Sequence, residues 1–389
     1  MSRNSQCTFS KKHVNCTLFI STAGWIFDAY DIVLFSILSI YILPALNVTT
    51  TTYSIIFGVQ LATTAVGGVL FGIFADKIGK REALTLDFIV YAISALLIFF
   101  SFDWLSLLVA RFVAGLAIGG EWGISSSLLN DVLGKEHKGL GFGVLQSGWS
   151  FGVGLAAISA IFIASTAGWR YSFLVGMFAL FLAGYVYYNV PHIPPKVYSF
   201  RKALRSVALK PLAKALGVSI LGMYAFYIVW TWLPRELVSS GILTPDQMFL
   251  FIGLSSITNG TGHILFGYLS DKFGRKQIFM FYTAVFVIAL LLVLFIVRNP
   301  MTVLGCLLAL QFACGFFAGF GPAFTEIFKE DVRTTGTSFV YNTGRGIAGV
   351  LMMLNLLGII AASFNLSLLA VTAIASVSVV VSALLYQRI

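Results

Sequence analysis

Apolar runs of about 20 residues recur along the whole chain and constrain its fold more than any other feature. Each run is long enough to cross the roughly 30 Å hydrocarbon core of a bilayer as a helix. The composition agrees, because 58% of the 389 residues are hydrophobic and only 10% are charged, with a mean hydropathy of +0.92. The sequence therefore predicts an all-α membrane protein with twelve transmembrane helices. The predicted spans are residues 17–43, 52–74, 83–101, 104–129, 139–164, 168–189, 214–238, 246–269, 277–297, 301–324, 335–360 and 365–386.

Basic residues are distributed unequally between the loops on the two sides of the predicted membrane. With the N-terminus inside, the outer loops hold only Arg170, Arg235 and Arg298, and the other loop Lys and Arg residues fall inside. Because cytoplasmic loops carry an excess of Lys and Arg, we predict that both termini are cytoplasmic. The protein is then a multi-pass protein of the plasma or inner membrane. The net charge of +10 follows from this topology and does not indicate nucleic-acid binding.

One loop motif occurs twice, at the same place in each half of the chain. Gly72–Arg81 follows the second predicted span, and Gly267–Lys276 follows the eighth, 195 residues later, with identical spacing of Gly, Asp, Gly and two basic residues. The same offset relates Asp131 to Glu326. We therefore predict two pseudo-symmetric six-helix bundles, as expected for a transporter built from internal repeats. The predicted domains are an N-terminal bundle at 1–190, a basic cytoplasmic linker at 191–213 and a C-terminal bundle at 214–389.

The chemistry of this motif suits a latch between the bundles. Its first Gly lets two helices approach closely, and its Asp can meet the N-terminus of a neighbouring helix and a basic side chain. Such a latch would stabilise one of two rocking states; the alternative is a tight turn that carries topogenic charges. The candidate gating-loop residues are Gly72, Asp76, Gly79, Arg81, Gly267, Asp271, Gly274 and Arg275.

A few ionisable residues remain inside the predicted spans, where a charge costs at least ~2.5 kcal/mol. Asp28 and Asp31 are three residues apart, so on a helix their side chains point the same way. In a low-dielectric interior, two carboxylates this close would not both stay ionised. We predict that Asp28, Asp31 and Glu121 are proton-coupling sites. Arg111 is their predicted partner, in an ion pair that breaks when an aspartate is protonated. The alternatives are that the acids fix helix packing and that Arg111 forms a permanent salt bridge.

Arg345 falls near the middle of the eleventh predicted span, at a depth where the second half has no acid. Its planar guanidinium matches a carboxylate, so we predict that it binds an anionic substrate. Alternatively, Arg345 pairs across the cavity with an acid and closes a gate, and both roles can hold in different states. His263 is predicted to form hydrogen bonds between helices. The other candidate substrate-binding residues are Tyr30, Gln146, Trp149, Tyr227, Trp230, Asn259, Gln311, Tyr341 and Asn342.

The repeated loop motif resembles the signature of the major facilitator superfamily, and the resemblance covers essentially the whole chain. It implies alternating access by rocking of two halves around a midplane site. Phe27–Asp31 and Gly120–Gly123 resemble the corresponding spans of proton-coupled organic-acid carriers of the sialate:proton symporter or monocarboxylate type. Tyr341–Arg345 is similar to a motif of organic-acid and metabolite symporters. The seventh span, Leu221–Pro234, departs from the lactate carriers and leaves the substrate open.

These observations predict a secondary active transporter for symport of a small organic anion, a carboxylate, with protons. The expected partners are the anion, protons and the lipid bilayer, and the expected state is a monomer. We expect no cofactor, no metal and no enzymatic activity, because the sequence has no metal-ligand cluster, nucleophile elbow or phosphate loop. The alternatives are a proton-linked sugar or polyol carrier, a proton-driven exporter of lipophilic compounds, and a sensor built on the same fold.

Overall fold

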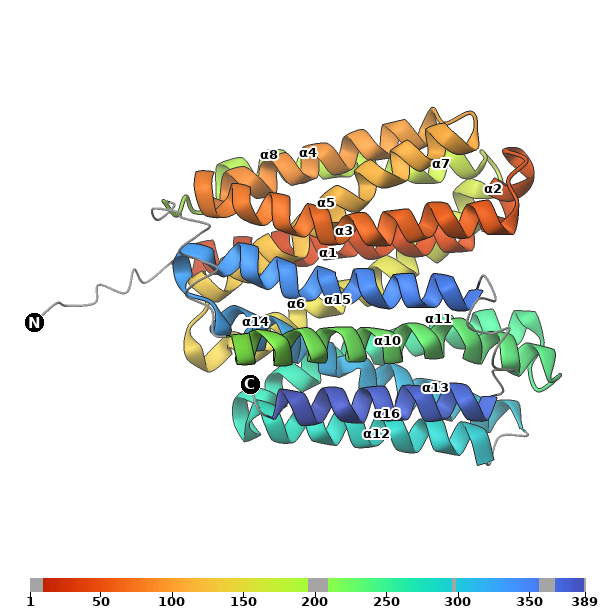
Figure 1. Ribbon diagram of the computed structural model, residues 1–389. Helices are drawn as coiled ribbons and strands as arrows, with labels where there is room; N and C mark the ends of the chain where they lie inside the picture. The colour runs from red at the N-terminus through yellow and green to blue at the C-terminus, as the bar shows by residue number, and fades with distance from the viewer. Residues whose placement is uncertain (1–9, 195–208, 296–298, 357–367, 388–389) are drawn as a thin grey trace, which may run out of the picture.

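The structure of the protein is a computed structural model that describes residues 10–194, 209–295, 299–356 and 368–387. Every regular element within these residues is a helix. The helices run side by side in two bundles, with the N-terminal half in the upper part of Figure 1 and the C-terminal half in the lower part. The predicted all-α membrane fold of two six-helix bundles is confirmed.

The chain order of the helices is the same as that of the predicted spans. The N-terminal bundle contains α1 (Lys11–Ile37), α2 (Ser39–Ala45), α3 (Thr50–Ile78), α4 (Lys80–Phe99), α5 (Trp104–Val132), α6 (Lys138–Ser159), α7 (Trp169–Phe173) and α8 (Ala179–Asn189). The C-terminal bundle contains α10 (Leu209–Ser239), α11 (Pro245–Phe273), α12 (Arg275–Phe295), α13 (Pro300–Ala313), α14 (Phe320–Ile327), α15 (Arg333–Leu356) and α16 (Leu368–Tyr386).

Nine helices in the described part of the chain are long and apolar enough by themselves to cross a membrane. The other three spans of the twelve are α11, α15 and α16. Polar residues such as Asn259 and His263 lower the hydropathy of α11, and Arg345 does the same for α15. These polar residues are buried between helices, so the bilayer does not meet them.

Two spans are interrupted by short 3-10 segments. The sixth span consists of α7, the segment Leu174–Phe178 and α8. The tenth consists of α13, the segment Cys314–Gly319 and α14. Tighter turns of this kind change the direction of the side chains that follow and often mark functional sites. The interruption of the tenth span lies at the level of the central cavity described below.

Side chains that cap the helices explain two of the short connections. Asp103 and Ser106 form a capping box at the start of α5, directly after α4 ends at Phe99. Thr244 and Gln247 form a second capping box at the start of α11. Such reciprocal hydrogen bonds satisfy backbone N–H groups that the first turn of a helix leaves free. A short turn at residues 100–103 therefore connects α4 to α5.

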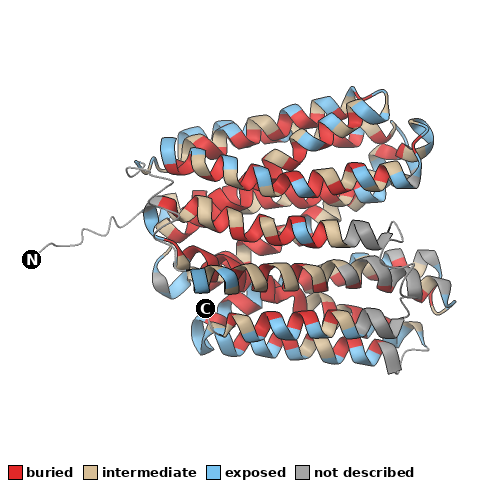
Figure 2. Cartoon of the chain, viewed as in Figure 1, coloured by how far each residue is buried: buried red, intermediate tan, exposed pale blue. Residues whose placement is uncertain are grey.

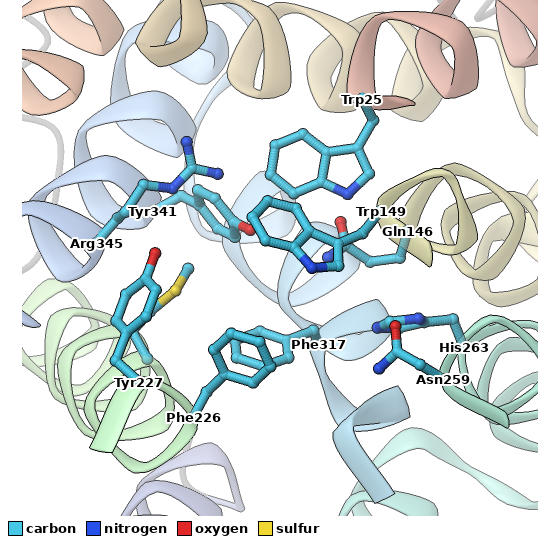
Figure 3. A pocket seen from close by; sticks show the side chains of 11 residues that line it. Trp25, Gln146, Trp149, Phe226, Tyr227, Asn259, His263, Phe317, Tyr341 and Arg345 are labelled. Carbon is cyan, nitrogen blue, oxygen red and sulfur yellow. The ribbon is translucent and has the colours of Figure 1, made fainter. Parts of the chain in front are cut away.

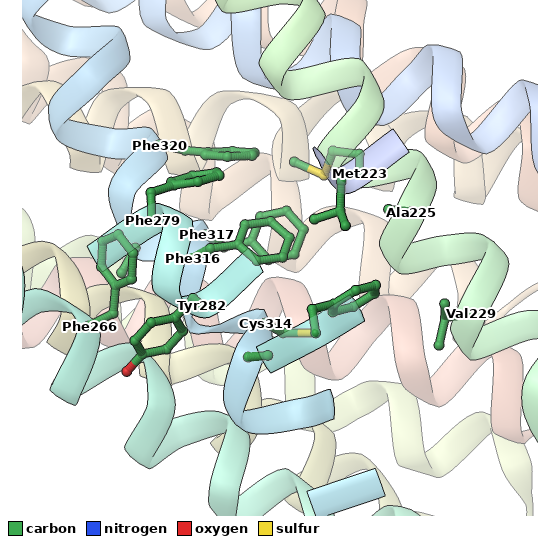
Figure 4. Close-up of a cluster of buried hydrophobic side chains, with 14 of the residues drawn as sticks. Met223, Ala225, Val229, Phe266, Phe279, Tyr282, Cys314, Phe316, Phe317 and Phe320 are labelled. Carbon is green, nitrogen blue, oxygen red and sulfur yellow. The ribbon is translucent and has the colours of Figure 1, made fainter. Parts of the chain in front are cut away.

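Large apolar side chains lie both inside the bundles and on their outer faces, as a lipid solvent requires. Figure 2 shows exposed residues along the peripheral helices and at the ends. Inside the C-terminal bundle, stacked rings of the tenth span and α12 form a dense core against α10 (Figure 4). Phe279 stacks on Tyr386 at 4.2 Å between ring centroids, and Phe316 stacks on Phe317 at 4.6 Å.

The predicted linker is only partly within the described residues. Residues 195–208 lie outside them, and α10 begins at Leu209, before the predicted start of the C-terminal bundle at residue 214. The division of the chain at 191–213 therefore stays a prediction.

Candidate functional site

Asp31 and Arg111 form a buried ion pair inside the N-terminal bundle. Arg111 Nη1 and Nη2 donate to the two carboxylate oxygens of Asp31 at 3.0 and 2.7 Å. Gln60 of α3 completes a ring of three, because it accepts from Arg111 Nε at 3.1 Å and donates to Asp31 Oδ2 at 3.0 Å. The guanidinium also lies 4.2 Å from the centroid of the Phe35 ring. The bidentate geometry and the extra hydrogen bonds are what a charge pair needs to be stable in a low-dielectric interior.

Asp28 does not share this partner, although it lies only three residues before Asp31. Its Oδ2 atom is buried and has no hydrogen-bond partner within the described residues. The charges that act most strongly on it are those of Glu121, which repels it, and Arg345, which attracts it. The two aspartates of α1 therefore have different surroundings: one is neutralised by Arg111, and the other faces the acids of α5 and α4.

Asp28, Asp87 and Glu121 form an acidic cluster. Glu121 and Asp87 of this cluster pack against the backbone of glycines. A Cβ atom added at Gly24 would lie 2.4 Å from Glu121 Oε1, and one added at Gly120 would lie 2.2 Å from Asp87 Oδ1. Glu121 Oε1 accepts a hydrogen bond from Ser125 at 2.6 Å. Glu121 Oε2 and Asp87 Oδ1 are buried without a partner among the described residues. The two glycines thus make room for carboxyl groups at the helix contacts.

A cavity with an empty volume of about 360 Å³ lies between the two bundles (Figure 3). Helices of both halves contribute to its wall: α1 and α6 from the first, and α10, α11, the Cys314–Gly319 segment and α15 from the second. Its position between the repeats matches the binding site expected of a transporter with internal repeats. Its lining residues are Trp25, Gln146, Trp149, Met223, Phe226, Tyr227, Asn259, His263, Phe317, Tyr341 and Arg345.

Arg345 is the cationic side chain of this cavity. It is 1% exposed, its Nη1 atom has no hydrogen-bond partner, and no described acidic residue forms an ion pair with it. The guanidinium carbon lies 5.0 Å from the ring centroids of both Trp25 and Tyr341. Cation–π contacts stabilise the charge without occupying its hydrogen-bond donors. Arg345 is therefore held in place with one of its donors unpaired among the described residues.

Stacked aromatic rings fix the wall next to Arg345. Tyr341 of α15 stacks on Trp122 of α5 with 3.5 Å between ring centroids, and Trp122 Nε1 donates to Gln146 Oε1 at 2.9 Å. Trp25 lies 5.4 Å from Trp149. The Tyr341–Trp122 stack crosses the boundary between the bundles, so a rocking motion of the bundles would change the shape of the cavity.

The structure brings together six of the predicted substrate-binding residues, Arg345, Gln146, Trp149, Tyr227, Asn259 and Tyr341. It places four others away from the cavity lining. Tyr30 donates to Ser159 Oγ at 2.9 Å inside the N-terminal bundle, and the Trp230 ring lies 6.4 Å from that of Phe226 between centroids. Gln311 offers its backbone carbonyl to Asn259, and Asn342 Nδ2 donates to Gly119 O at 2.7 Å. Asn342 thus belongs to the contact between α15 and α5.

Five lining residues were not among the predicted substrate-binding residues. Four of them are apolar and have no sequence signal that separates a cavity wall from ordinary packing: Trp25, Met223, Phe226 and Phe317. The fifth is His263, for which a signal exists. It follows Asn259 by four residues, so the two share one face of α11. Neither ring nitrogen of His263 forms a well-aligned hydrogen bond among the described residues, but backbone groups of Asn259 and, from the tenth span, Cys314 lie close enough to act on the ring.

At the end of the molecule that carries the loop motifs, called the motif end, each motif Asp binds the first turn of a helix in the other bundle. Asp76 Oδ2 accepts from Thr335 N at 2.9 Å and from Thr335 Oγ1 at 2.6 Å, at the start of α15. Asp271 accepts from Gly139 N at 2.8 Å and from Leu140 N at 2.9 Å, at the start of α6. Free N–H groups and the helix dipole make a helix start favourable for a carboxylate. The cavity is therefore closed at this end by two equivalent caps.

A pair of ionic bridges follows the same symmetry. Asp131 joins Lys80 of its own bundle to Arg333 of the other, with 2.8 Å between Arg333 Nη1 and Asp131 Oδ1. Each of these three residues has its counterpart 195 residues away. Glu326 joins Arg275 at 2.8 Å to Lys138 at 3.9 Å.

The glycines of the motifs have two different tasks. A Cβ atom at Gly72 would lie 2.7 Å from Thr335 Cα, and one at Gly267 would lie 2.3 Å from Gly139 O, so both permit contact between bundles. Gly79 and Gly274 have φ angles of +111° and +93°, which side chains other than hydrogen rarely allow. They turn the chain from α3 into α4 and from α11 into α12.

Arg81 does not take part in these bridges. It donates to Glu82 Oε1 at 3.0 and 2.8 Å, and its guanidinium lies 5.2 Å from the centroid of the Tyr187 ring. Lys80 is the residue that corresponds to Arg275, since each directly follows the second motif glycine.

Twelve spanning helices in two bundles, closed at one end around a buried cavity with a charged wall, define a membrane transporter of small molecules. The chain belongs to the Major Facilitator Superfamily, whose family model matches residues 16–353.

Two relatives show what this chain is similar to. It is 28% identical over 350 residues to a probable 4-methylmuconolactone transporter of Cupriavidus pinatubonensis, covering 85% of this chain and 80% of the relative. It is also 28% identical over 338 residues to the sialic acid transporter NanX of Escherichia coli, covering 84% of this chain and 83% of the relative. Both are named as transporters, in agreement with the prediction that the protein is not an enzyme.

Among solved structures, the proton:xylose symporter XylE has a TM-score of 0.83 to this chain at 16% identity, covering 98% of this chain and 96% of XylE. The human organic anion transporter MFSD10 has a TM-score of 0.76 at 15% identity, covering 97% of this chain and 99% of that one. At this identity the likeness establishes the fold alone.

Proposed function

We propose that the protein is a secondary active transporter that moves a small organic anion together with protons by alternating access. The observation that carries this proposal is Arg345, a fully buried cation with an unpartnered donor in a cavity between the two bundles. A buried charge of this kind needs a counter-charge. A carboxylate substrate would provide one and would receive charge-assisted hydrogen bonds in return.

The names of the relatives support an organic acid as cargo. Sialic acid is a carboxylate, and a muconolactone is the lactone of an unsaturated dicarboxylic acid. The wall of the cavity favours an acid over a sugar for a physical reason. Its cationic side chain, Arg345, gains a counter-charge from a carboxylate and none from a neutral sugar.

We propose that protons are carried by the acidic residues of α1 and α5. Asp28 Oδ2 and Glu121 Oε2 are buried and find no hydrogen-bond partner in the described part of the chain, and the charge of Arg345 attracts both side chains. Protonation of these acids would remove that competing attraction and leave Arg345 to the substrate anion. Because the charges of the substrate-bound cavity are then neutralised, less free energy is needed to close it on one side of the membrane and open it on the other. The Asp31–Arg111 ion pair would then couple this change of charge to the N-terminal bundle.

The motif end is proposed to be the cytoplasmic side, because the basic residues of the chain gather there. Both termini would then be cytoplasmic in a plasma or inner membrane, with bundles at 1–190 and 214–389 joined by the linker at 191–213. The state described is accordingly closed to the cytoplasm. A monomer is sufficient for this mechanism, since the cavity is built from one chain.

Transport by the purified protein in proteoliposomes tests the proposal. Uptake of radiolabelled lactate, pyruvate, sialic acid and benzoate is measured with and without an inward proton gradient. We expect gradient-driven uptake of at least one of these carboxylates, and its loss in Arg345→Ala. Arg170→Ala is the matched control, because Arg170 lies far from the cavity and donates to Ser101 O. Uptake of xylose without uptake of any carboxylate, by a folded protein, would overturn the proposal.

A further inference from the structure

The cavity has two polar ends, and the second of them suggests which acids the protein selects. Resting on the proposed function, we propose that the substrate is a planar aromatic or conjugated carboxylate with a second hydrogen-bonding group, and that His263 binds this second group. Arg345 would bind the carboxylate at one end, and His263 would bind a hydroxyl, a ring nitrogen or a carbonyl at the other. The two residues come from α15 and α11 and lie on opposite sides of the cavity in Figure 3.

His263 is available for this role because neither ring nitrogen forms a well-aligned hydrogen bond among the described residues, and the nearest polar groups that act on the ring are backbone groups of Asn259 and Cys314. The His263 side chain is 2% exposed. An imidazole can donate from one nitrogen and accept at the other, so it can bind either kind of polar group. Leaving two polar atoms buried and unpaired is costly, and a bound ligand would remove that cost.

Asn259 lies next to His263 on the same face of α11, and its side-chain amide already forms two hydrogen bonds within the protein. Its Oδ1 atom accepts from Ser150 Oγ at 2.6 Å, and its Nδ2 atom donates to Gln311 O at 3.1 Å. The first bond joins α11 to α6 and the second joins α11 to α13, so together they fix one side of the cavity. His263 is thus the polar side chain of α11 that the fold leaves for the substrate.

The wall between the two polar ends consists largely of ring faces. Trp25, Trp149, Phe226, Phe317 and Tyr341 surround the space between Arg345 and His263 (Figure 3). Such rings stack well on a flat ligand and offer few hydrogen bonds. A single planar ring with two polar substituents fits these properties better than a chair-shaped sugar acid does.

Competition against uptake of radiolabelled benzoate by the wild-type protein tests the shape and the second contact separately. Benzoate and cyclohexanecarboxylate carry the same charge on a planar and a non-planar ring. We expect benzoate to compete several-fold better, as stacking predicts. Among 3-hydroxybenzoate, 4-hydroxybenzoate and nicotinate, we expect at least one to compete about tenfold better than benzoate, which is the gain from one buried hydrogen bond.

Variants at His263 then assign the second contact. In His263→Leu we expect the preference for the substituted acid over benzoate, measured as the ratio of the two in the same variant, to disappear. His263→Gln should keep part of the preference, because its amide retains a donor and an acceptor. Arg170→Ala, which lies away from the cavity and donates to Ser101 O, is the control and should keep the wild-type order.

Two results would overturn the inference while leaving anion transport intact. One is equal competition by benzoate, cyclohexanecarboxylate and the substituted acids in a protein that transports lactate or sialic acid. The other is an unchanged preference for the substituted acid in His263→Leu. The competition result needs no variant, so it tests the inference even if substitutions at His263 impair folding. Failure of the proposed function itself would appear differently, as the absence of uptake of every carboxylate.

Discussion

Arg333 of the C-terminal bundle donates a hydrogen bond to Asp131 of the N-terminal bundle at 2.8 Å between Nη1 and Oδ1. The other carboxylate oxygen of Asp131 is bound by Lys80. One acid therefore connects two basic residues that belong to different bundles. The Asp76 cap on α15 lies beside this bridge, and both interactions must break before the bundles can separate at the motif end.

Asp131→Asn should weaken this closed state. The substitution removes the charge that holds Lys80 and Arg333 together, and two neighbouring cations then repel each other. We expect a larger fraction of molecules open at the motif end, measured as a longer distance between spin labels at Gly134 and Lys329. These two exposed positions lie in equivalent loops of the two bundles.

The control for this experiment is Glu136→Gln, which removes an exposed acid from the same loop. It should leave the distance distribution unchanged. An unchanged distribution in Asp131→Asn as well would mean that the ionic bridge does not hold the bundles together.

Gly267→Ala should act on the same equilibrium through sterics. The added methyl group would lie 2.3 Å from Gly139 O, so α11 and α6 must move apart. Gly253→Ala is the matched control in α11, because a Cβ atom there meets nothing within 4 Å. In the control the helix propensity of Ala adds stability of up to about 1 kcal/mol. Alkylation of a cysteine introduced at Ser270 measures the result, and equal rates in the two variants would contradict the prediction.

The Asp31–Arg111 pair should show strong coupling in stability. Removing one partner leaves an uncompensated buried charge, which costs about 3–5 kcal/mol. We expect Asp31→Asn and Arg111→Gln each to lower the unfolding temperature in detergent substantially. The double variant should lose much less than the sum, because no charge remains unpaired. Additive losses would show that the ion pair is not a unit.

Asp28→Asn and Glu121→Gln should separate coupling from transport. Both substitutions mimic the protonated acid in shape and remove its charge. We expect exchange of labelled for unlabelled substrate across the membrane to continue, while accumulation driven by a proton gradient is lost in at least one of the two variants. Full gradient-driven accumulation in both variants would exclude these two acids as the proton sites. Asp103→Asn, at the start of α5, is a suitable control because its carboxylate serves as a helix cap.

The fold was predictable because its signals are local and repeated. Length and hydropathy locate the spans, and a motif that occurs twice with one offset reveals the two bundles. Even the polar spans α11 and α15 were found, since polar residues interrupt their apolar runs without ending them. The breaks in the sixth and tenth spans were not predicted, because Gly-containing apolar segments occur in continuous helices too.

The site was predictable where a charge stands in an apolar run, and less so elsewhere. Arg345 and Arg111 are conspicuous for this reason. Spacing alone placed Asp28 and Asp31 on one side of α1, but it did not reveal that only Asp31 reaches Arg111. That difference depends on Gln60 of α3, which is distant in sequence. Likewise, Phe317 lines the cavity because a 3-10 segment turns it there, and its sequence context is that of any packed phenylalanine.

The two ionic bridges at the motif end are equivalent in sequence but differ in their exposure to water. The Asp131 side chain is 10% exposed and sits between two close partners, whereas the Glu326 side chain is 46% exposed with Lys138 3.9 Å away. Dissolved ions screen an exposed pair far more than a buried one. Raising the ionic strength would therefore loosen the Glu326 side first and let water enter along α6 and α11. The resting conformation of the protein then depends on the salt content of the compartment that this face meets.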